Sequence, residues 1–166
     1  MPAQTSRHLR SLGMIALAAI SVVLASLLGQ LATYPNLVPW YAGLTKPSFN
    51  PPNWIFAPVW TTLYALMAFS VWRILRLPTA TPGRRQALIL FFVQLALNAA
   101  WSWMFFAARS PLLGLVNVVP QLLVVLATVG AFHRVDRIAA LCLLPLAVWV
   151  AFATALNASI WWLNPA

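Results

Sequence analysis

Amide and indole side chains recur at helical spacing within long apolar stretches of this sequence. The three stripes consist of Trp60, Tyr64 and Met67; of Gln94, Asn98, Trp101 and Phe105; and of Trp149, Ala153 and Asn157. Residues at intervals of three and four lie on one face of an α-helix. Aromatic walls with a few amide groups suit a large, flat, mostly apolar ligand, and the small Ala153 would leave room for it. The same stripes are also typical of packing between membrane helices, where amides link neighbouring helices.

The sequence lacks the side chains that most catalytic and metal sites need. Asp136 is its one carboxylate side chain, which excludes paired-carboxylate catalysis and a carboxylate-rich Ca²⁺ or Mg²⁺ site. His8 and His133 lie far apart, and Cys142 lies in an apolar run without a neighbouring base. This pattern argues against a zinc site and against a cysteine nucleophile. We therefore predict no catalytic residue, no metal site and no resident cofactor.

The composition is that of a membrane protein. Of the 166 residues, 63% are hydrophobic and 7% are charged, and the mean hydropathy is +0.87. A soluble domain carries about 45–50% apolar and about 25% charged residues. The formal net charge of +9 would suggest nucleic acid as a partner in a soluble protein. Here the arginines stand in short connectors between apolar runs, so we expect membrane lipid as a partner and no nucleic acid.

Five stretches without charge are each close to the roughly 20 residues that cross a bilayer as a helix. They cover residues 12–32, 54–72, 87–108, 112–132 and 138–163. Polar and apolar residues do not alternate as they do in a membrane β-barrel. The first stretch is longer than the roughly 7–15 apolar residues of a signal peptide, which favours a membrane span. We predict an all-α fold, a bundle of five transmembrane helices forming a single domain over residues 1–166.

The positive charges favour one orientation of this bundle. With five spans, the N-terminus and the second and fourth connectors share one side of the membrane. That side carries Arg7, Arg10, Arg73, Arg76, Arg84, Arg85, Arg134 and Arg137, whereas the other carries Lys46 and Arg109. The positive-inside rule predicts a cytoplasmic N-terminus and an outside C-terminus, as in a bacterial inner membrane. Asp136 stands between Arg134 and Arg137, and we expect it to form an ion pair at the surface there.

The first connector, residues 33–53, is rich in proline and aromatic residues. It contains five prolines, each of which fixes φ, and aromatic side chains that supply apolar area with few rotamers. We therefore expect an ordered cap over the mouth of the bundle. Trp40, Tyr41 and Trp54 also suit the aromatic belt at the membrane–water interface.

Three blocks of the sequence resemble a known family. They are WYAGLTKPSFNPPNWIFAPVWTTLYALM at residues 40–67, QLALNAAWSWMFFAAR at residues 94–109 and LPLAVWVAFATALNASIWWLN at residues 144–164. In content and order they strongly resemble the TspO/MBR family, which includes bacterial tryptophan-rich sensory proteins and the mitochondrial translocator protein. The resemblance implies the same plan of five spans, often assembled as a homodimer. Ala96 and Ala100 form a small-xxx-small pair, a pattern found at contacts between membrane helices.

The resemblance also implies a ligand site. Members of the family bind porphyrins and related tetrapyrroles, and mitochondrial members bind cholesterol and benzodiazepine-type drugs. Carried over by position, the pocket lies between the spans and is roofed by the first connector. The ligand-binding residues that the resemblance implies are Trp40, Trp54, Trp60, Asn98, Trp101, Trp149, Ala153 and Asn157.

The chain departs from the family pattern at several positions. Ala158 and Trp162 stand where the sterol-recognition pattern needs a tyrosine and then a basic residue, so we do not carry sterol binding over to that site. Leu113 replaces a tryptophan of the mitochondrial members, from which we expect weaker drug binding. Phe49 and Asn50 replace a tryptophan and a histidine of their first connector.

We therefore expect an integral membrane sensor that binds a tetrapyrrole. Two alternatives stay open at this point. One is light-dependent porphyrin degradation, in which Trp60 and Trp149 would react with the excited ring. The other is transport of porphyrins or other lipophilic ligands, although coupled transport usually depends on ionisable residues within the spans.

Overall fold

The computed structural model describes residues 2–165, and the side chains of residues 12–165. Within that range all regular elements are helical, which confirms the predicted fold class. Five helices are long and apolar enough to cross a membrane. They are α1 (Pro2–Thr33), α2 (Asn53–Leu75), α3 (Arg84–Ser102), α4 (Pro111–Val135) and α5 (Arg137–Leu163), with short helical turns η1 (Tyr34–Asn36), η2 (Leu37–Tyr41) and η3 (Trp103–Ala107) between them.

Local capping explains where three of these helices begin. The Oγ atom of Ser110 accepts the N–H of Leu113 at 3.2 Å ahead of α4. A carboxylate oxygen of Asp136 accepts the N–H of Ala139 at 3.0 Å ahead of α5. Such bonds satisfy amides that the first turn of a helix leaves free. Gly83 precedes α3 with a φ of 78°, a left-handed conformation that glycine adopts without steric cost.

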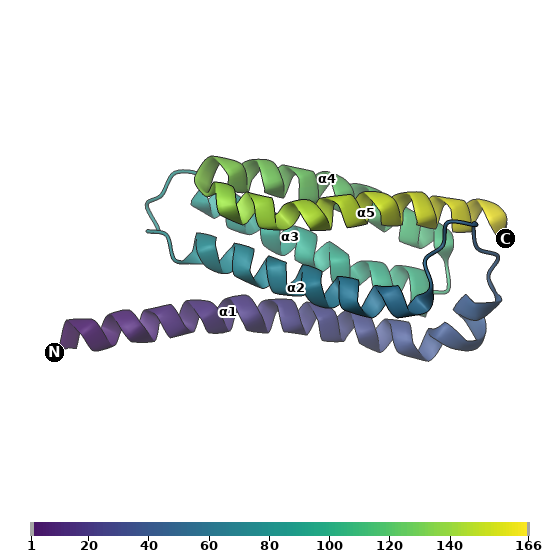
Figure 1. Ribbon diagram of the computed structural model, residues 1–166, viewed down its shortest axis with the longest axis horizontal. Helices are drawn as coiled ribbons and strands as arrows, with labels where there is room; N and C mark the ends of the chain where they lie inside the picture. Colours follow the sequence, from purple (N-terminus) through teal and green to yellow (C-terminus); the bar gives the residue numbers. More distant parts are fainter. Residues whose placement is uncertain (1, 166) are drawn as a thin grey trace.

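The five long helices run side by side along the long axis of the molecule (Figure 1). Their contacts form a closed circuit in the order α1, α2, α5, α4 and α3, and α3 packs against α1. The order in space therefore differs from the order in the chain, because α2 neighbours the last helix. Phe91 of α3 and Phe132 of α4 are fully buried and stacked, with ring centroids 6.0 Å apart. Between α2 and α5 the hydroxyl of Ser70 donates to the carbonyl of Ala139 at 2.7 Å.

The outer surface of the bundle is apolar. Leu31, Leu123 and Val148, which lie within the predicted spans, are 65%, 63% and 70% exposed. A soluble monomer rarely exposes continuous apolar surface on this scale, whereas a bilayer accepts it. The bundle therefore has the exterior of a membrane protein.

Part of the first connector, which we predicted to be an ordered cap, is helical. Two short turns, η1 and η2, follow α1 directly. The backbone breaks between them at Val38, whose φ and ψ of −130° and 133° are not helical. Proline is compatible with the first turn of a helix, because the amide that it lacks has no partner there. Within this connector, residues 44–52 have no helical structure, and we call them the lid segment.

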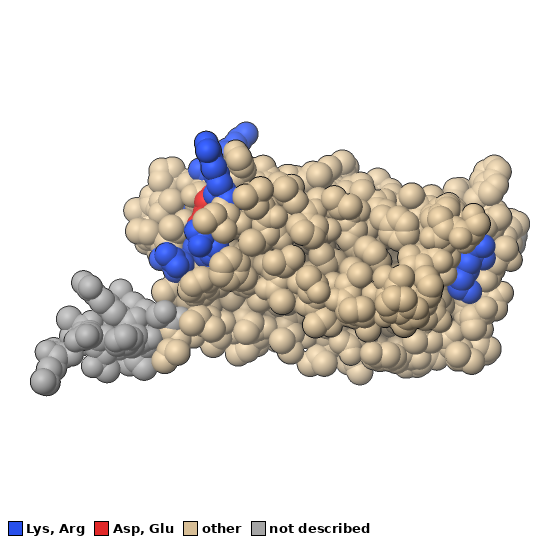
Figure 2. All heavy atoms as spheres, in the orientation of Figure 1, with Lys and Arg blue, Asp and Glu red and all other residues tan. Residues whose placement is uncertain are grey.

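Charged side chains gather at the two ends of the molecule, with a long uncharged middle between them (Figure 2). The turn between α2 and α3 and the junction between α4 and α5 lie at one end, which we call the arginine end. Its described basic residues are Arg73, Arg76, Arg84, Arg85, Arg134 and Arg137. The side chains of Arg7 and Arg10, predicted for the same end, lie outside the described residues.

Asp136 does not form the surface ion pair that we predicted with its sequence neighbours. It binds Arg73 of α2, with 2.9 Å between Nη2 and Oδ2 and bonds of 3.0 and 3.2 Å from Nε to the two carboxylate oxygens. The Asp136 side chain is only 12% exposed. Because the chain is extended at Asp136 and α5 begins at the next residue, the carboxylate faces the bundle and meets α2. The ion pair therefore joins α2 to the α4–α5 junction.

Candidate functional site

The predicted stripes converge at the end of the bundle that carries the lid segment. Three elements supply them: α2 over residues 60–67, α3 with η3 over residues 94–105, and α5 over residues 149–157. At this end the lid segment passes over the ends of α2 and α5 (Figure 1). The stripes thus meet opposite the arginine end.

An aromatic wall lines the contact between α2 and α5. The rings of Trp60 and Trp149 meet edge to face, with centroids 6.5 Å apart and planes at 87°. Tyr64 lies one turn after Trp60 with its ring 5.4 Å away, and Phe56 packs against Trp149 at 5.8 Å. Edge-to-face geometry is favourable because the positive edge of one ring meets the negative face of the other. The wall is therefore held in a defined geometry by its own contacts.

Asn98 places a polar group beside this wall. Its side chain is 5% exposed, and its Oδ1 accepts the hydroxyl of Tyr64 at 2.8 Å. A buried amide in an apolar bundle needs such a partner, because an unmade hydrogen bond costs about 1–3 kcal/mol. The pair places a phenol and an amide next to Trp60, where a ligand with polar atoms would meet them.

Trp101 and Asn157 form a second hydrogen-bonded group. The indole Nε1–H of Trp101 donates to Oδ1 of Asn157 at 3.0 Å, and Nδ2 of Asn157 donates to the carbonyl of Pro111 at 2.7 Å. Trp101 also stacks on Phe105, with centroids 4.9 Å apart. Asn157 thus joins α5 to the end of α3 and to the start of α4. Here the interpretation as interhelical packing, which the sequence left open, describes the observed contacts.

Gly114 is a site residue that the sequence reasoning did not identify. A Cβ atom at this position would lie 2.7 Å from Oδ1 of Asn157 and 2.7 Å from the Phe105 ring. Glycine is therefore required for α4 to approach the Trp101–Asn157 group. Glycines are frequent in membrane helices, so the residue type alone gave no signal.

Trp40 belongs to the Trp101 group, whereas Ala153 is placed only by its position on α5. Trp40, in η2, packs edge-on against Phe105 at 5.5 Å and therefore covers the Trp101 cluster. Ala153 is half-buried one turn after Trp149 on α5. Next to it, Phe152 contacts both Trp149 and Phe49, a residue of the lid segment. Trp40 and Phe49 both belong to the first connector, so the connector contacts η3 through Trp40 and α5 through Phe49.

Trp54 stands apart from the other predicted site residues. Its side chain is 74% exposed in the first turn of α2, and the aromatic contacts of the described residues do not include it. Six residues separate Trp54 from Trp60, a spacing that turns it about 120° around the helix. The inward position is taken by Phe56, four residues before Trp60. The predicted residues with observed contacts therefore fall into two groups. Trp60, Asn98 and Trp149 belong to one, and Trp40, Trp101 and Asn157 belong to the other.

The lid segment is fixed by the end of α5. The amide of Thr45 donates to Oδ1 of Asn164 at 2.9 Å, and Nδ2 of Asn164 donates to the carbonyl of Thr45 at 2.9 Å. The same Nδ2 donates to the carbonyl of Ile160 at 2.7 Å. One side chain therefore pairs with both backbone groups of Thr45, and we call this contact the Asn164 latch.

Two buried amide oxygens have no hydrogen-bond partner among the described residues. They are Oε1 of Gln94 and Oδ1 of Asn117. The amide nitrogen of Gln94, Nε2, lies 3.7 Å from the sulfur of Met67. Buried polar atoms are nearly always satisfied by protein, ordered water or ligand. These oxygens give the interior of the bundle two acceptors that a ligand or water can use.

The chain matches the TspO/MBR family over residues 16–163. It is similar to the tryptophan-rich protein TspO of Chlorobaculum tepidum, with 42% identity over 132 residues that cover 79% of this chain and 84% of the relative. It is similar to the TspO protein of Archaeoglobus fulgidus, with 40% identity over 148 residues that cover 89% and 95%. It also matches the human translocator protein, with 42% identity over 125 residues that cover 74% and 73%. Because the match spans most of the sequence and the fold has five apolar helices, the chain belongs to the TspO/MBR family and is an integral multi-pass membrane protein.

Proposed function

We propose that this protein binds a tetrapyrrole of the porphyrin class in the site between α2, α3 and α5 and acts as a membrane sensor of that ligand. The observation that carries the proposal is the Trp60–Trp149 pair beside the Tyr64–Asn98 hydrogen bond. Flat indole surfaces favour a flat conjugated macrocycle, and buried amides and hydroxyls offer partners to its polar atoms.

The surroundings of the site support the same ligand class. Lys46 and Arg109 lie at this end of the bundle, where they can meet the carboxylates that porphyrins carry at their edge. The aromatic side chains are packed against one another and against the lid segment. We therefore expect ligand entry to require displacement of the lid segment.

The test is a titration of the purified protein in detergent with protoporphyrin. We expect quenching of tryptophan fluorescence at micromolar porphyrin, together with a change in the porphyrin absorbance from which Kd is read. Trp149→Phe replaces the indole of the edge-to-face pair by a smaller ring, and Ala153→Leu adds bulk one helical turn after it. We expect each to raise Kd roughly threefold to tenfold. For Trp149→Phe the reason is a weakened aromatic contact, which contributes about 0.5–1.5 kcal/mol, and for Ala153→Leu it is steric exclusion of the ligand.

The matched control is Trp162→Phe, because Trp162 is 78% exposed and contributes to neither group of the site. Its Kd should equal that of the unaltered protein. Absence of quenching at micromolar porphyrin, or an equal loss of affinity in Trp162→Phe, would show that this site does not bind the ligand.

Light-dependent breakdown of the porphyrin is the second candidate function. The edge contact between Trp60 and Trp149 favours it, because two indoles would lie against the excited ring. A time course of porphyrin absorbance in light and in darkness, with and without oxygen, separates breakdown from binding. If denatured protein bleaches the porphyrin at the same rate, the breakdown is not an activity of the folded site.

We further propose a bacterial inner membrane as the location, with the arginine end in the cytoplasm and the C-terminus outside. The support is the excess of arginine at that end, as the positive-inside rule requires. A reporter fused to the C-terminus should be active only outside the cytoplasm, and activity only in the cytoplasm would reverse the orientation. The homodimer implied by the family is also a proposal, and light scattering of the detergent-solubilised protein tests it.

A further inference from the structure

Gln94 and Asn98 are two buried amides on the same face of α3. They are 0% and 5% exposed, and their separation of four residues places one a helical turn above the other. The Cβ atoms of side chains at this spacing are about 5–6 Å apart. The interior of the bundle therefore holds two amides within a short distance of each other.

Each of these amides contacts α2 through one of its ends. Oδ1 of Asn98 accepts the hydroxyl of Tyr64 at 2.8 Å, and Nε2 of Gln94 lies 3.7 Å from the sulfur of Met67. Tyr64 and Met67 are three residues apart on α2, so the two contacts are neighbours along the α2–α3 interface. The other end of each amide is Nδ2 of Asn98, which is a donor, and Oε1 of Gln94, which is an acceptor.

Oε1 of Gln94 has no donor within the part of the chain that the structure describes. The hydroxyls of the interior are engaged elsewhere, and each has one proton to donate. Those of Ser70 and Thr128 donate to backbone carbonyls, both at 2.7 Å, and that of Tyr64 donates to Asn98. Because buried polar atoms are nearly always paired, this oxygen requires a donor from outside the protein.

We propose that one buried water molecule bridges Gln94 and Asn98, accepting a hydrogen bond from Nδ2 of Asn98 and donating one to Oε1 of Gln94. Water suits both ends, because it accepts and donates at once. Buried waters typically bind two to four otherwise unpaired polar groups. Two successive hydrogen bonds of about 2.8–3.0 Å span the distance of about 5–6 Å between neighbouring turns.

The water joins the two α2–α3 contacts into one network. It connects the Tyr64–Asn98 hydrogen bond to Gln94 and Met67, beside the aromatic wall of the candidate site. The network uses only water and this chain, so it does not depend on the proposed binding of a porphyrin.

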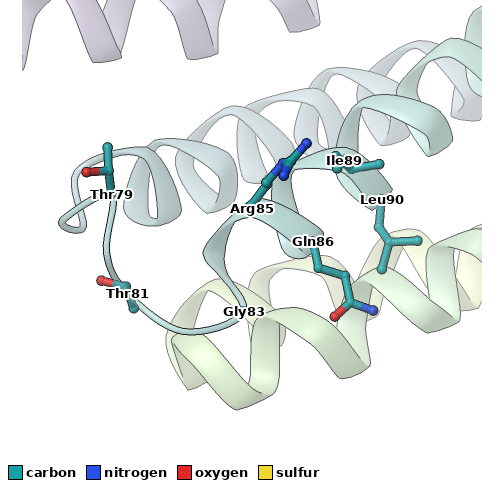
Figure 3. A pocket seen from close by; sticks show the side chains of 7 residues that line it. All are labelled: Thr79, Thr81, Gly83, Arg85, Gln86, Ile89 and Leu90. Atoms are coloured by element: carbon teal, nitrogen blue, oxygen red, sulfur yellow. The ribbon is translucent and has the colours of Figure 1, made fainter.

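The proposed water is enclosed by the bundle and differs from water in the surface hollow at the α2–α3 turn (Figure 3). That hollow is lined by Thr79, Thr81, Gly83 and Gln86 among other residues. Gln86 is exposed there, whereas Gln94, eight residues further along the same helix, is fully buried. The two glutamines of α3 therefore give a matched pair for experiments.

The first test is a crystal structure of the full-length protein without added porphyrin, at a resolution that shows ordered water. We expect a density peak about 2.7–3.2 Å from both Oε1 of Gln94 and Nδ2 of Asn98. A direct hydrogen bond between these two atoms, or the absence of a peak that contacts both, would overturn the proposal.

The second test is magnetisation transfer from water protons to the side-chain amides of ¹⁵N-labelled protein in lipid bilayers. The Nδ2 signal of Asn98 should receive it. Asn157 is the internal control, because it is 2% exposed and its side-chain oxygen and nitrogen both bond to protein groups. Its signal should be several-fold weaker, and equal transfer to Asn98 and Asn157 would contradict a specific water site.

Gln94→Met removes the acceptor and keeps a side chain of similar length. Transfer to Asn98 should then fall to the level of Asn157, and the melting temperature should decrease, because Nδ2 of Asn98 loses its partner. A higher melting temperature would mean that the unaltered protein carried an unpaired oxygen at Gln94, which contradicts the water bridge. Gln86→Met, on the same helix, should leave both measurements unchanged.

Discussion

At the scale of single residues, the absence of a side chain at Gly114 is as important to the site as the tryptophans. We predict that Gly114→Ala destabilises the protein by about 1–3 kcal/mol, the usual cost of adding a methyl group to a packed interior. The added Cβ would meet both Asn157 and Phe105, so the Trp101–Asn157 hydrogen bond should also weaken. Thermal unfolding in detergent and the near-UV circular dichroism of tryptophan measure the two effects.

Gly130→Ala is the control on the same helix. A Cβ atom at Gly130 would have no obstructing atom within 4 Å. In addition, alanine favours a helix over glycine by roughly 1 kcal/mol. Gly130→Ala should therefore be neutral or stabilising. If the two variants were equally destabilised, loss of helix flexibility rather than steric contact would be the cause.

Helical spacing placed most of the site residues correctly in the interior. Asn98 and Asn157 are 5% and 2% exposed, as expected of amides that must avoid lipid. Spacing also accounts for Trp54, because a separation of six residues from Trp60 does not return to the same face. Its place in the pocket came from the resemblance and not from the period of α2. Its contribution to ligand binding stays a prediction.

At the scale of elements, the Arg73–Asp136 ion pair joins α2 to the start of α5. Burial alone would raise the pKa of Asp136, but the amide of Ala139 and the guanidinium and charge of Arg73 outweigh it, so the pKa is lowered. A lowered folded-state pKa stabilises the fold above the unfolded value of about 3.9, and this contribution is lost as pH falls through the folded value. We predict that stability decreases with acid below about pH 4.

Asp136→Asn tests this assignment directly, because the sequence has no other carboxylate side chain. In this variant the melting temperature should change little between about pH 5 and pH 3, where side-chain carboxylates titrate. Arg73→Gln should also flatten the profile, whereas Arg134→Gln, at an exposed position of the same end, should not. An unchanged acid dependence in Asp136→Asn would assign the effect to another group.

The helices could be predicted from the sequence more completely than the contacts between them. The length of each apolar run determines a span, since the bilayer allows few alternatives. The partner of Asp136 lies 63 residues away and that of Thr45 lies 119 residues away, and no local pattern indicates either pairing. The nearest charges in the sequence, Arg134 and Arg137, were the predicted partners of Asp136. Its carboxylate instead faces α2, because the packing of α5 determines the direction in which the side chain points.

At the scale of the whole molecule, the Asn164 latch connects the end of α5 to the lid segment, which covers the candidate site. We predict that Asn164→Ala accelerates hydrogen exchange at the amide of Thr45 by about tenfold or more, since two hydrogen bonds of about 0.5–1.5 kcal/mol each are lost. Porphyrin should associate and dissociate faster, with a smaller change in Kd. Hydrogen exchange measured by mass spectrometry on residues 44–52 requires no ligand and therefore tests the latch independently of the proposed function.

Asn53→Ala is the control for the latch, because Asn53 is an exposed amide at the start of α2 next to the lid segment. Exchange in residues 44–52 should not respond to it. Unchanged exchange in Asn164→Ala would mean that aromatic contacts such as Phe49–Phe152 hold the lid segment without the latch.

The closed circuit of helices also bears on how the protein is made. Spans enter the membrane in chain order, yet α2 finds its neighbour α5 only when the last span has been synthesised. Until then Trp60 lacks its partner Trp149, and the lid segment lacks Asn164, which follows α5. The proposed ligand site can therefore form only after α5 has been synthesised, which makes binding a late property of the nascent chain.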